Sequence, residues 1–269
     1  MAIQARGASR FVEANGIRQH YLEYGSGPVE LVIVPGISSP AITWEFVAEE
    51  LARDYRVLTL DIRGRGLSDR PASDYSLPEY AADVAGLIGA LGLQRPVVLG
   101  HSMGARIVAA LGALHPGTHG PLIVVDPPLT GPGRALYPTS LASFREQLHE
   151  AYAGTTAADV RRFFPGWSDT ALQLRAEWLG TCDEHAVVTT YENFEREDFF
   201  GYWRRLPPPL LFVRGGESPV VTTAGEREVR EANPAAEVVT IARAGHMIPW
   251  DNLPEFLEAV RAFLLRVAA

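Results

Sequence analysis

The chain has 269 residues, of which 47% are hydrophobic and 21% are charged, a composition that fits one globular domain with a sizeable core. Its formal net charge of −8 argues against a surface built for nucleic acid or for an anionic membrane. The single cysteine, Cys182, excludes an intrachain disulfide.

Targeting and metal-binding patterns are missing from the sequence. No segment approaches the roughly 18 apolar residues of a membrane span, and the first 16 residues lack the apolar run of a secretory signal peptide. We therefore expect a cytoplasmic protein that does not bind a membrane. The seven histidines show none of the spacings typical of metal ligands, so we expect no metal site.

The first half of the chain predicts strands that alternate with helices. Residues 11–14 and 18–24 alternate in polarity and flank an Asn-Gly pair, the signal of a hairpin. The apolar run 30–34 is typical of a strand buried on both faces. Further strands are expected at 56–60, 96–100 and 121–126, and helices near 43–53, 77–91 and 103–114. This alternation predicts βαβ units and a mostly parallel sheet flanked by helices.

The alternation stops at residue 127. A loop-like segment follows, and residues from about 139 to 205 are helical in pattern and rich in aromatic side chains. The sheet is expected to resume at 206–213, with a helix near 222–232, a strand at 237–241 and a last helix at 254–266. We therefore predict an α/β core of residues 1–127 and 206–269 that carries a helical lid of residues 128–205.

A serine between two glycines follows the predicted strand 96–100. Gly100, Ser102 and Gly104 match the pattern G-x-S-x-G, and a predicted helix begins directly after the serine. In that context a sharp turn raises the serine hydroxyl above the carboxyl edge of the sheet and points the helix N-terminus at the same place. Ser102 is therefore the candidate nucleophile.

A serine hydroxyl needs a base that a third group holds in place. His246 follows the last predicted strand and so emerges at the same edge as Ser102. Two carboxylates could orient it: Asp126 ends the strand 121–126, and Glu217 follows the strand 206–213. Either one preserves the chain order serine, acid, histidine.

The tetrahedral intermediate of such a reaction carries a negative charge that needs preorganised donors. The backbone N–H of Met103, the residue after the nucleophile, is one candidate. The other is the N–H of Ile37 in the segment VPGISSP, where Gly36 allows the backbone to approach closely.

Together these motifs resemble the α/β-hydrolase superfamily over essentially the whole chain. The resemblance includes DIRGRGLSDRP at 61–71 and AGHMIPWDNLPEF near the C-terminus. It implies Ser102, Asp126 and His246 as a catalytic triad. Many members carry the acid after the penultimate strand, where this chain has Ser218; the superfamily's other arrangement, with the acid after the preceding strand, fits Asp126 and favours it over Glu217.

Segments of the predicted lid, such as VDPPLTGPGRALYP and WSDTALQLRAEWLGTC, resemble more narrowly the N-formylmaleamate deformylases of aerobic nicotinate degradation. That resemblance implies hydrolysis of a small anionic N-formyl amide to maleamate and formate through a formyl-enzyme, without a cofactor.

An anionic substrate calls for a cation, and arginine binds a carboxylate through two hydrogen bonds. Arg134 is the first choice, because its glycine-rich loop begins where Asp126 ends. Arg106 and Arg175 are further candidates, although Arg106 could brace the lid and Arg175 could pair with a neighbouring acid. Trp250 is a candidate for the wall of the pocket.

Two alternatives remain open. A carboxylesterase, an enol-lactonase or a C–C bond hydrolase could use the same scaffold, since a fold does not fix a substrate. A ligand-binding receptor on a hydrolase scaffold could also carry these residues. The sequence leaves the oligomeric state undetermined.

Overall fold

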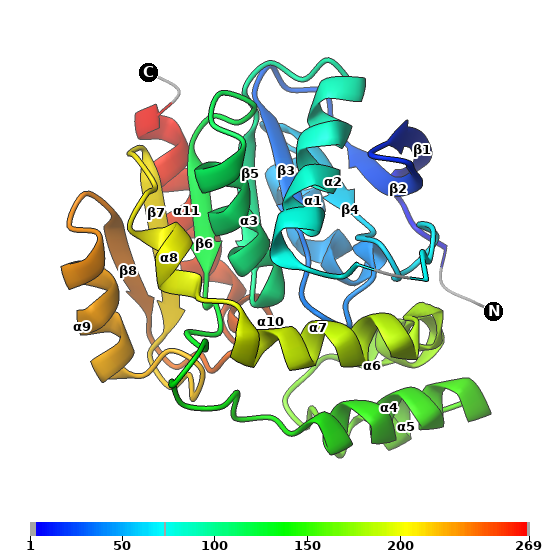
Figure 1. Cartoon of the computed structure of the whole chain (residues 1–269). Helices are drawn as coiled ribbons and strands as arrows, with labels where there is room; N and C mark the ends of the chain where they lie inside the picture. The colour runs from blue at the N-terminus through cyan, green and yellow to red at the C-terminus, as the bar shows by residue number, and fades with distance from the viewer. Residues whose placement is uncertain (1–3, 73, 268–269) are drawn as a thin grey trace.

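The structure, a computed structural model, describes residues 4–72 and 74–267. Over these residues the chain forms an eight-stranded sheet with helices on both faces (Figure 1). The sheet order is β1-β2-β4-β3-β5-β6-β7-β8. The strands are β1 (Ala8–Ala14), β2 (Ile17–Tyr24), β3 (Glu30–Val34), β4 (Arg56–Leu60), β5 (Val97–His101), β6 (Leu122–Val125), β7 (Leu210–Gly215) and β8 (Glu237–Ile241).

Strands β3 to β8 run parallel to one another, whereas β2 pairs antiparallel with both β1 and β4. The prediction of a mostly parallel sheet is therefore confirmed. The carboxyl ends of the parallel strands meet at one edge, and in α/β sheets this edge is where ligands bind.

Each face of the sheet is covered by helices because the central strands are apolar on both sides. Val32, Val98 and Phe212 face one core cluster, whereas Leu31, Ile33 and Leu99 face the other. The helices α2 (Leu77–Ala90) and α3 (Met103–Leu114) contribute buried side chains to the first cluster, and α1 (Glu45–Leu51) and α11 (Leu253–Val267) contribute to the second. The helix α9 (Thr223–Ala232) adds its buried Val229 to the first cluster.

A long helical segment lies between β6 and β7. It contains α4 (Leu141–Ala153), α5 (Ala157–Val160), α6 (Asp169–Trp178), η2 (Leu179–Thr181), α7 (Glu184–Arg196) and α8 (Phe199–Trp203). Serine, threonine or aspartate side chains accept hydrogen bonds at the N-termini of these α-helices, which fixes where they begin. Helices α4 to α7 lie beyond the end of the sheet, whereas α8 returns to pack beside α3 and α9 (Figure 1).

Some boundaries differ from those expected. The strand expected at 206–213 begins only at Leu210, because Pro207, Pro208 and Pro209 have no N–H to donate to a neighbouring strand. The helix expected at 43–53 starts as the 3-10 turn η1 (Ala41–Trp44) and continues as α1 only to Leu51. A short helix, α10 (Ile248–Asp251), follows the loop after β8.

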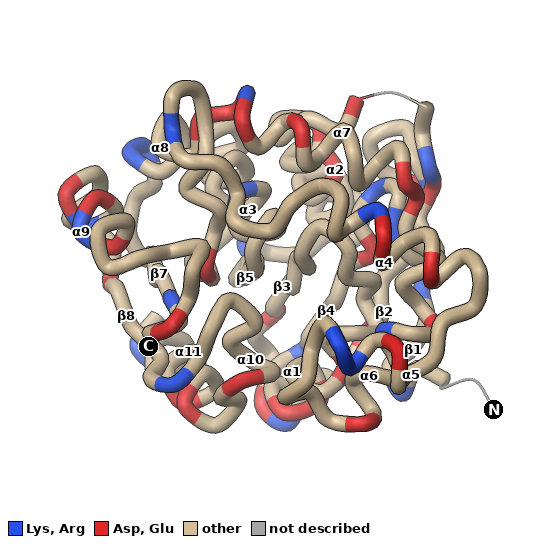
Figure 2. Tube along the Cα trace, turned by 90° about the horizontal axis from the view of Figure 1, so that it is seen from below, with Lys and Arg blue, Asp and Glu red and all other residues tan. Residues whose placement is uncertain are grey.

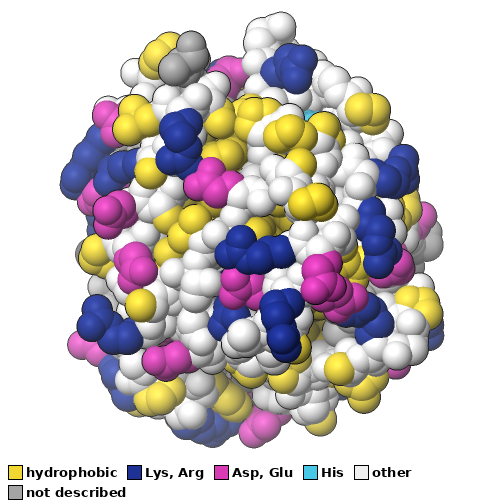
Figure 3. Space-filling model, turned by 90° about the vertical axis from the view of Figure 1, so that its left-hand side faces the viewer, with side chains coloured by type: hydrophobic (Ala, Val, Ile, Leu, Met, Phe, Trp, Pro, Cys, Tyr) yellow, Lys and Arg dark blue, Asp and Glu magenta, His cyan; other side chains and the backbone are white. Residues whose placement is uncertain are grey.

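The surface carries mixed charge. Seen from the side of the inserted helices, acidic and basic positions alternate around the rim of the molecule, while the backbone above β3 and β5 is largely uncharged (Figure 2). The face in Figure 3 also intersperses both signs with apolar side chains. No helix in the described ranges combines the length and the hydropathy needed to cross a bilayer.

Candidate active site

Ser102 occupies a strained turn between β5 and α3. Its backbone has φ 56° and ψ −118°, a region that a residue with a side chain rarely adopts and that costs about 1–3 kcal/mol. The flanking glycines make this turn possible. A Cβ on Gly100 would lie 2.1 Å from the carbonyl oxygen of Gly104, and a Cβ on Gly104 would lie 2.0 Å from that of Val34. The pattern G-x-S-x-G is thus required by close backbone packing.

Three side chains from different loops meet at this turn. His246, in the loop after β8, places its Nε2 2.9 Å from the Ser102 Oγ. Its Nδ1 lies 2.7 Å from the Oδ2 of Asp126, which directly follows β6 and is fully buried. Because the carboxylate accepts the Nδ1 proton, Nε2 is left with a lone pair that accepts the serine hydroxyl.

Asp126 is the carboxylate that the structure places against His246. Its other contacts are the N–H of Gly215 at 3.3 Å and the hydroxyl of Ser218 at 2.5 Å, both of which donate to it. Ser218 stands where many family members carry the acid. In this chain its hydroxyl donates to Asp126, which takes the place of that acid. Glu217 is exposed, and its amide donates to the carbonyl of Ala244.

His101, next to the serine, holds the backbone of His246. Its Nε2–H donates to the His246 carbonyl at 2.8 Å, and the two rings lie with centroids 4.9 Å apart. Burial lowers the pKa of His101 to about 3, so this ring is neutral at working pH.

The two candidate oxyanion donors lie beside Ser102. Met103 is the first residue of α3, and such an amide has no partner within its own helix. The segment of Gly36 and Ile37 passes close by, since a Cβ on Gly36 would lie 3.5 Å from the Cβ of Ser102. Ile37 also lines the cavity above the serine.

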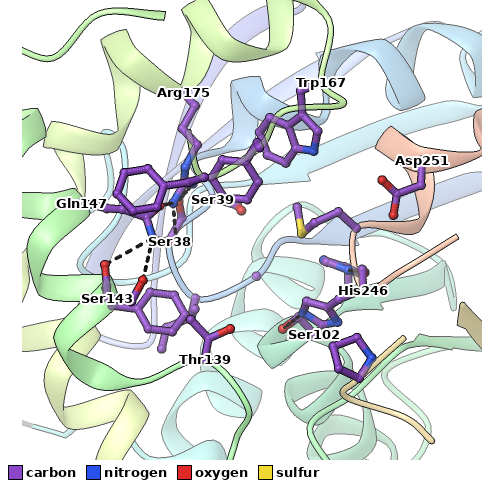
Figure 4. Close-up of a pocket in the computed structure, with 18 of the residues that line it drawn as sticks. Ser38, Ser39, Ser102, Thr139, Ser143, Gln147, Trp167, Arg175, His246 and Asp251 are labelled. Carbon is purple, nitrogen blue, oxygen red and sulfur yellow. Dashed lines mark hydrogen bonds between the residues drawn. The ribbon is translucent and has the colours of Figure 1, made fainter. Parts of the chain in front are cut away.

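A cavity of about 490 Å³ opens above Ser102 (Figure 4). Loops of the sheet edge form one side, with Gly36–Ser39, His101, Ser102 and His246 among them. The inserted segment forms the other side, and contributes Tyr137, Thr139, Ser143, Phe144, Gln147, Trp167 and Arg175.

Arg175, on α6, reaches the cavity without a carboxylate partner among the described residues (Figure 4). Its guanidinium donates to the carbonyl and hydroxyl oxygens of Ser38, at 3.2 and 3.3 Å, and to the Oε1 of Gln147 at 2.9 Å. The pairing with a neighbouring acid that the sequence left open is therefore not formed. Burial lowers the pKa of Arg175 to about 10, so it remains a cation at neutral pH.

The other predicted binding residues lie away from this cavity. Arg134 forms an ion pair with Glu228, with N–O distances of 2.8 and 2.5 Å. Arg106 is fully buried and donates to backbone carbonyls at both ends of the inserted segment, among them those of Pro128 and Glu197. It thus braces that segment, the alternative that the sequence had left open.

Trp250 lies behind Trp167, with the two rings stacked at 5.2 Å. It lines a second cavity of about 240 Å³. Trp167 stands between this second cavity and the one at Ser102, because it lines both.

Several polar residues of the site carry no signal in the sequence. Tyr137 lines the cavity and places its hydroxyl 3.2 Å from the Nε2 of His246. Gln147 and Ser38, which hold Arg175, lie on segments far apart in the chain. Within the described ranges, no group of three or more histidine, cysteine, aspartate or glutamate side chains could hold a metal ion.

Comparison with known proteins extends these observations. An N-formylmaleamate deformylase of Pseudomonas putida is 46% identical over 257 residues, which cover 94% of this chain and 95% of that protein. The 2-(acetamidomethylene)succinate hydrolase of Mesorhizobium japonicum is 27% identical over 95% of each chain. The crystal structure of an N-formylmaleamic acid deformylase from another strain of Pseudomonas putida has a TM-score of 0.90 and 41% identity, covering 94% of this chain and all of that one.

The model of the alpha/beta hydrolase family matches residues 31–260, which include Ser102, Asp126 and His246. This match spans most of the described chain, and it agrees with the sheet order and the strained serine turn. The chain is therefore a hydrolase of the alpha/beta hydrolase family.

Proposed function

We propose that this hydrolase cleaves N-formylmaleamate to maleamate and formate, with Ser102, His246 and Asp126 as its catalytic triad. The observation that carries the proposal is a hydrogen-bonded serine, histidine and aspartate at the base of a cavity that also contains an arginine free of any carboxylate among the described residues. The 46% identity to a deformylase over nearly the whole chain supports this choice of substrate.

The first step joins Ser102 to the formyl carbon in a tetrahedral intermediate, and the ester forms when the C–N bond breaks in the second step. Ser102 Oγ attacks the formyl carbon while its proton passes to Nε2 of His246, 2.9 Å away. Asp126 stabilises the resulting imidazolium through its contact with Nδ1. The N–H groups of Ile37 and Met103 donate to the oxygen on which the negative charge develops.

The second step breaks the C–N bond. The electron pair of that bond goes to nitrogen, which takes the proton from Nε2, and maleamate leaves. The departing nitrogen is conjugated to a second carbonyl, so it leaves more readily than an ordinary amine. Water, deprotonated by His246, then attacks the formyl ester and releases formate and Ser102.

Arg175 binds the carboxylate of the substrate in this scheme. It is the one arginine that lines the cavity among the described residues, and none of their carboxylates pairs with it to offset the cost of its burial. An anionic ligand would supply that charge. We assign this role to Arg175 in place of Arg134 and Arg106, whose guanidinium groups are engaged elsewhere.

The inserted segment serves as the lid of the site. Helices α4 and α6 supply Gln147 and Arg175, which lie opposite Ser102 across the cavity (Figure 4). We propose that these helices exclude bulk water around a small anionic molecule, and that neither nucleic acid nor a membrane is a partner.

Formate release tests the proposal. Purified protein is incubated with N-formylmaleamate and, in parallel, with small neutral esters, an enol lactone and a C–C hydrolase substrate. We expect the highest kcat/KM for N-formylmaleamate, with many turnovers per protein molecule. Preference for an ester or a lactone would refute the substrate, and binding without turnover would indicate a receptor.

Two matched variants test which carboxylate, Asp126 or Glu217, is the acid of the triad. Asp126→Asn is expected to lower kcat by about 10⁴-fold, because the amide favours the wrong histidine tautomer. Glu217→Gln, at an exposed position just after β7, is expected to leave kcat unchanged. The opposite result would assign the role to Glu217.

A further inference from the structure

Tyr137 places a phenol hydroxyl at the reacting atoms of the site. The residue lies between β6 and α4, with its ring packed among Phe144, Tyr191 and Phe194. Only 8% of the residue is exposed, and its hydroxyl lies 3.2 Å from the Nε2 of His246. That nitrogen receives the serine proton and later delivers it.

In the free protein, the Nε2 of His246 cannot accept hydrogen bonds from both Ser102 and Tyr137. The Nδ1–H of His246 donates to Asp126, so Nε2 offers a single lone pair. The hydroxyl of Ser102 takes that lone pair at 2.9 Å, a shorter contact than the one from Tyr137. The proton of Tyr137 is thus available to a group that enters the cavity.

The hydroxyl also remains protonated. Burial raises the pKa of Tyr137 well above its usual value. A neutral phenol inside a cavity donates one strong hydrogen bond and carries no charge that would repel an anionic substrate.

We propose, building on the function proposed above, that Tyr137 is a further catalytic residue that donates a hydrogen bond to the leaving group. To take its proton, the departing nitrogen must lie within hydrogen-bond distance of Nε2. The hydroxyl of Tyr137 lies next to that same atom, so it faces the leaving group.

The contribution of Tyr137 arises as the C–N bond breaks. The electron pair passes to nitrogen and spreads onto the carbonyl oxygen conjugated with it. Tyr137 donates to that oxygen, while the proton of Nε2 goes to nitrogen. The phenol keeps its own proton throughout, so the residue stabilises charge and transfers nothing.

Removal of the Tyr137 hydroxyl tests this role. Tyr137→Phe keeps the ring in its aromatic cluster, and Tyr191→Phe is the matched control: its ring lies 6.2 Å from that of Tyr137, and its hydroxyl donates instead to the carbonyl of Thr139. Each variant is assayed with N-formylmaleamate and with a series of aryl acetates of increasing leaving-group basicity. The melting temperature and the rate of fluorophosphonate labelling at Ser102 report whether the site is intact.

We expect Tyr137→Phe to lower kcat on the amide by about 100-fold, the usual effect of losing one preorganised donor. Hydrolysis of p-nitrophenyl acetate, whose leaving group needs little stabilisation, should change by no more than about threefold. The dependence of kcat on leaving-group basicity should become steeper. Tyr191→Phe should match the wild type on every substrate.

Two results would overturn the inference. An equal loss on the amide and on all esters would show that the hydroxyl only positions His246. An unchanged kcat on every substrate would show that it does nothing. If the wild type releases no formate while Tyr137→Phe still steepens the ester series, the proposed substrate is wrong and the role of Tyr137 stands.

Discussion

The described part of the chain contains two hydrogen-bonded serine–histidine–aspartate arrays. In the array at the cavity, Ser102 and His246 are 2.9 Å apart, and His246 and Asp126 are 2.7 Å apart. In the other, Ser9 lies 2.9 Å from His20, which lies 2.6 Å from Asp61. By distances between side chains alone, the two arrays are almost the same.

The backbone at the two serines differs. Ser9 lies in β1, paired with Leu22 of β2 in an ordinary antiparallel register, and it is exposed. Ser102 lies in a strained turn at the N-terminus of α3 and beside the loop of Gly36. Only the second arrangement places the proposed amide donors, Ile37 and Met103, next to the hydroxyl, and such donors supply much of the catalysis in serine hydrolases.

The two aspartates also accept hydrogen bonds from different groups. Asp61 accepts the backbone N–H groups of Ala41 at 2.6 Å and Leu67 at 3.0 Å, so its carboxylate ties together two loops at the sheet edge. Asp126 accepts Ser218 and Gly215, which hold it toward His246. The first array is therefore a structural clamp that shares its residue types with an active site.

The cavities beside the two arrays complete the contrast. The cavity at Ser9 and His20 measures about 420 Å³ and has no arginine among its described lining residues. The cavity at Ser102 has Arg175. We infer that a triad becomes catalytic through the backbone and the cavity around it.

The largest effect is expected at the two serines. Ser102→Ala should lower kcat by about a million-fold, because the nucleophile is lost. Ser9→Ala should leave kcat unchanged. Formate release measures both variants, and labelling of the wild type by a fluorophosphonate should modify Ser102 alone. Labelling of Ser9 would show that the second array is also reactive.

The two histidines should separate activity from stability. His246→Ala should also lose about a million-fold in kcat, yet its free energy of unfolding should change by only about 1 kcal/mol, because Asp126 keeps two donors. Asp61 also keeps two donors, but the His20 side chain is only 3% exposed, against 16% for His246. Its removal in His20→Ala leaves a cavity and should lower the free energy of unfolding by about 3 kcal/mol. Urea denaturation and activity assays on each folded variant distinguish these outcomes. Loss of turnover in folded His20→Ala would contradict the contrast.

Arg175→Met should raise KM for an anionic substrate by about 10- to 100-fold, the size of a lost charged hydrogen bond. KM for a neutral ester should not change. Arg134→Met is the control, since that side chain pairs with Glu228 outside the cavity. Equal effects on the anionic and the neutral substrate would rule out binding of the carboxylate by Arg175.

The smallest effect is a dependence of KM on pH. Burial disfavours the cation and lowers the pKa of Arg175 to about 10, so the charge is present below that pH and is lost as pH rises through it. KM for the anionic substrate should therefore be flat up to about pH 9 and rise about tenfold per unit above pH 10. A neutral ester should show no such rise, and a flat KM for the anion would argue against the assignment.

Much of the core could be predicted from the sequence, because its signals are local. Apolar runs of five residues mark strands buried on both faces, and Gly100 and Gly104 mark a turn that only glycine permits. The order of strands and motifs then brings Ser102 and His246 to one edge. The predicted start of one strand was wrong because prolines precede it, and the strand begins only at Leu210.

By itself, the sequence determined the fold class and pointed to the proposed nucleophile and its base, since each depends on a short pattern and on its place after a strand. Only the tertiary structure decided that Asp126 and not Glu217 meets His246, that Arg175 and not Arg134 lines the cavity, and that Tyr137 reaches Nε2. The contacts of His246 with Asp126 and with Tyr137 join residues 120 and 109 positions apart, and Arg175 lies on an inserted helix. Their geometry follows from how the helices pack over the sheet edge, which no local pattern records.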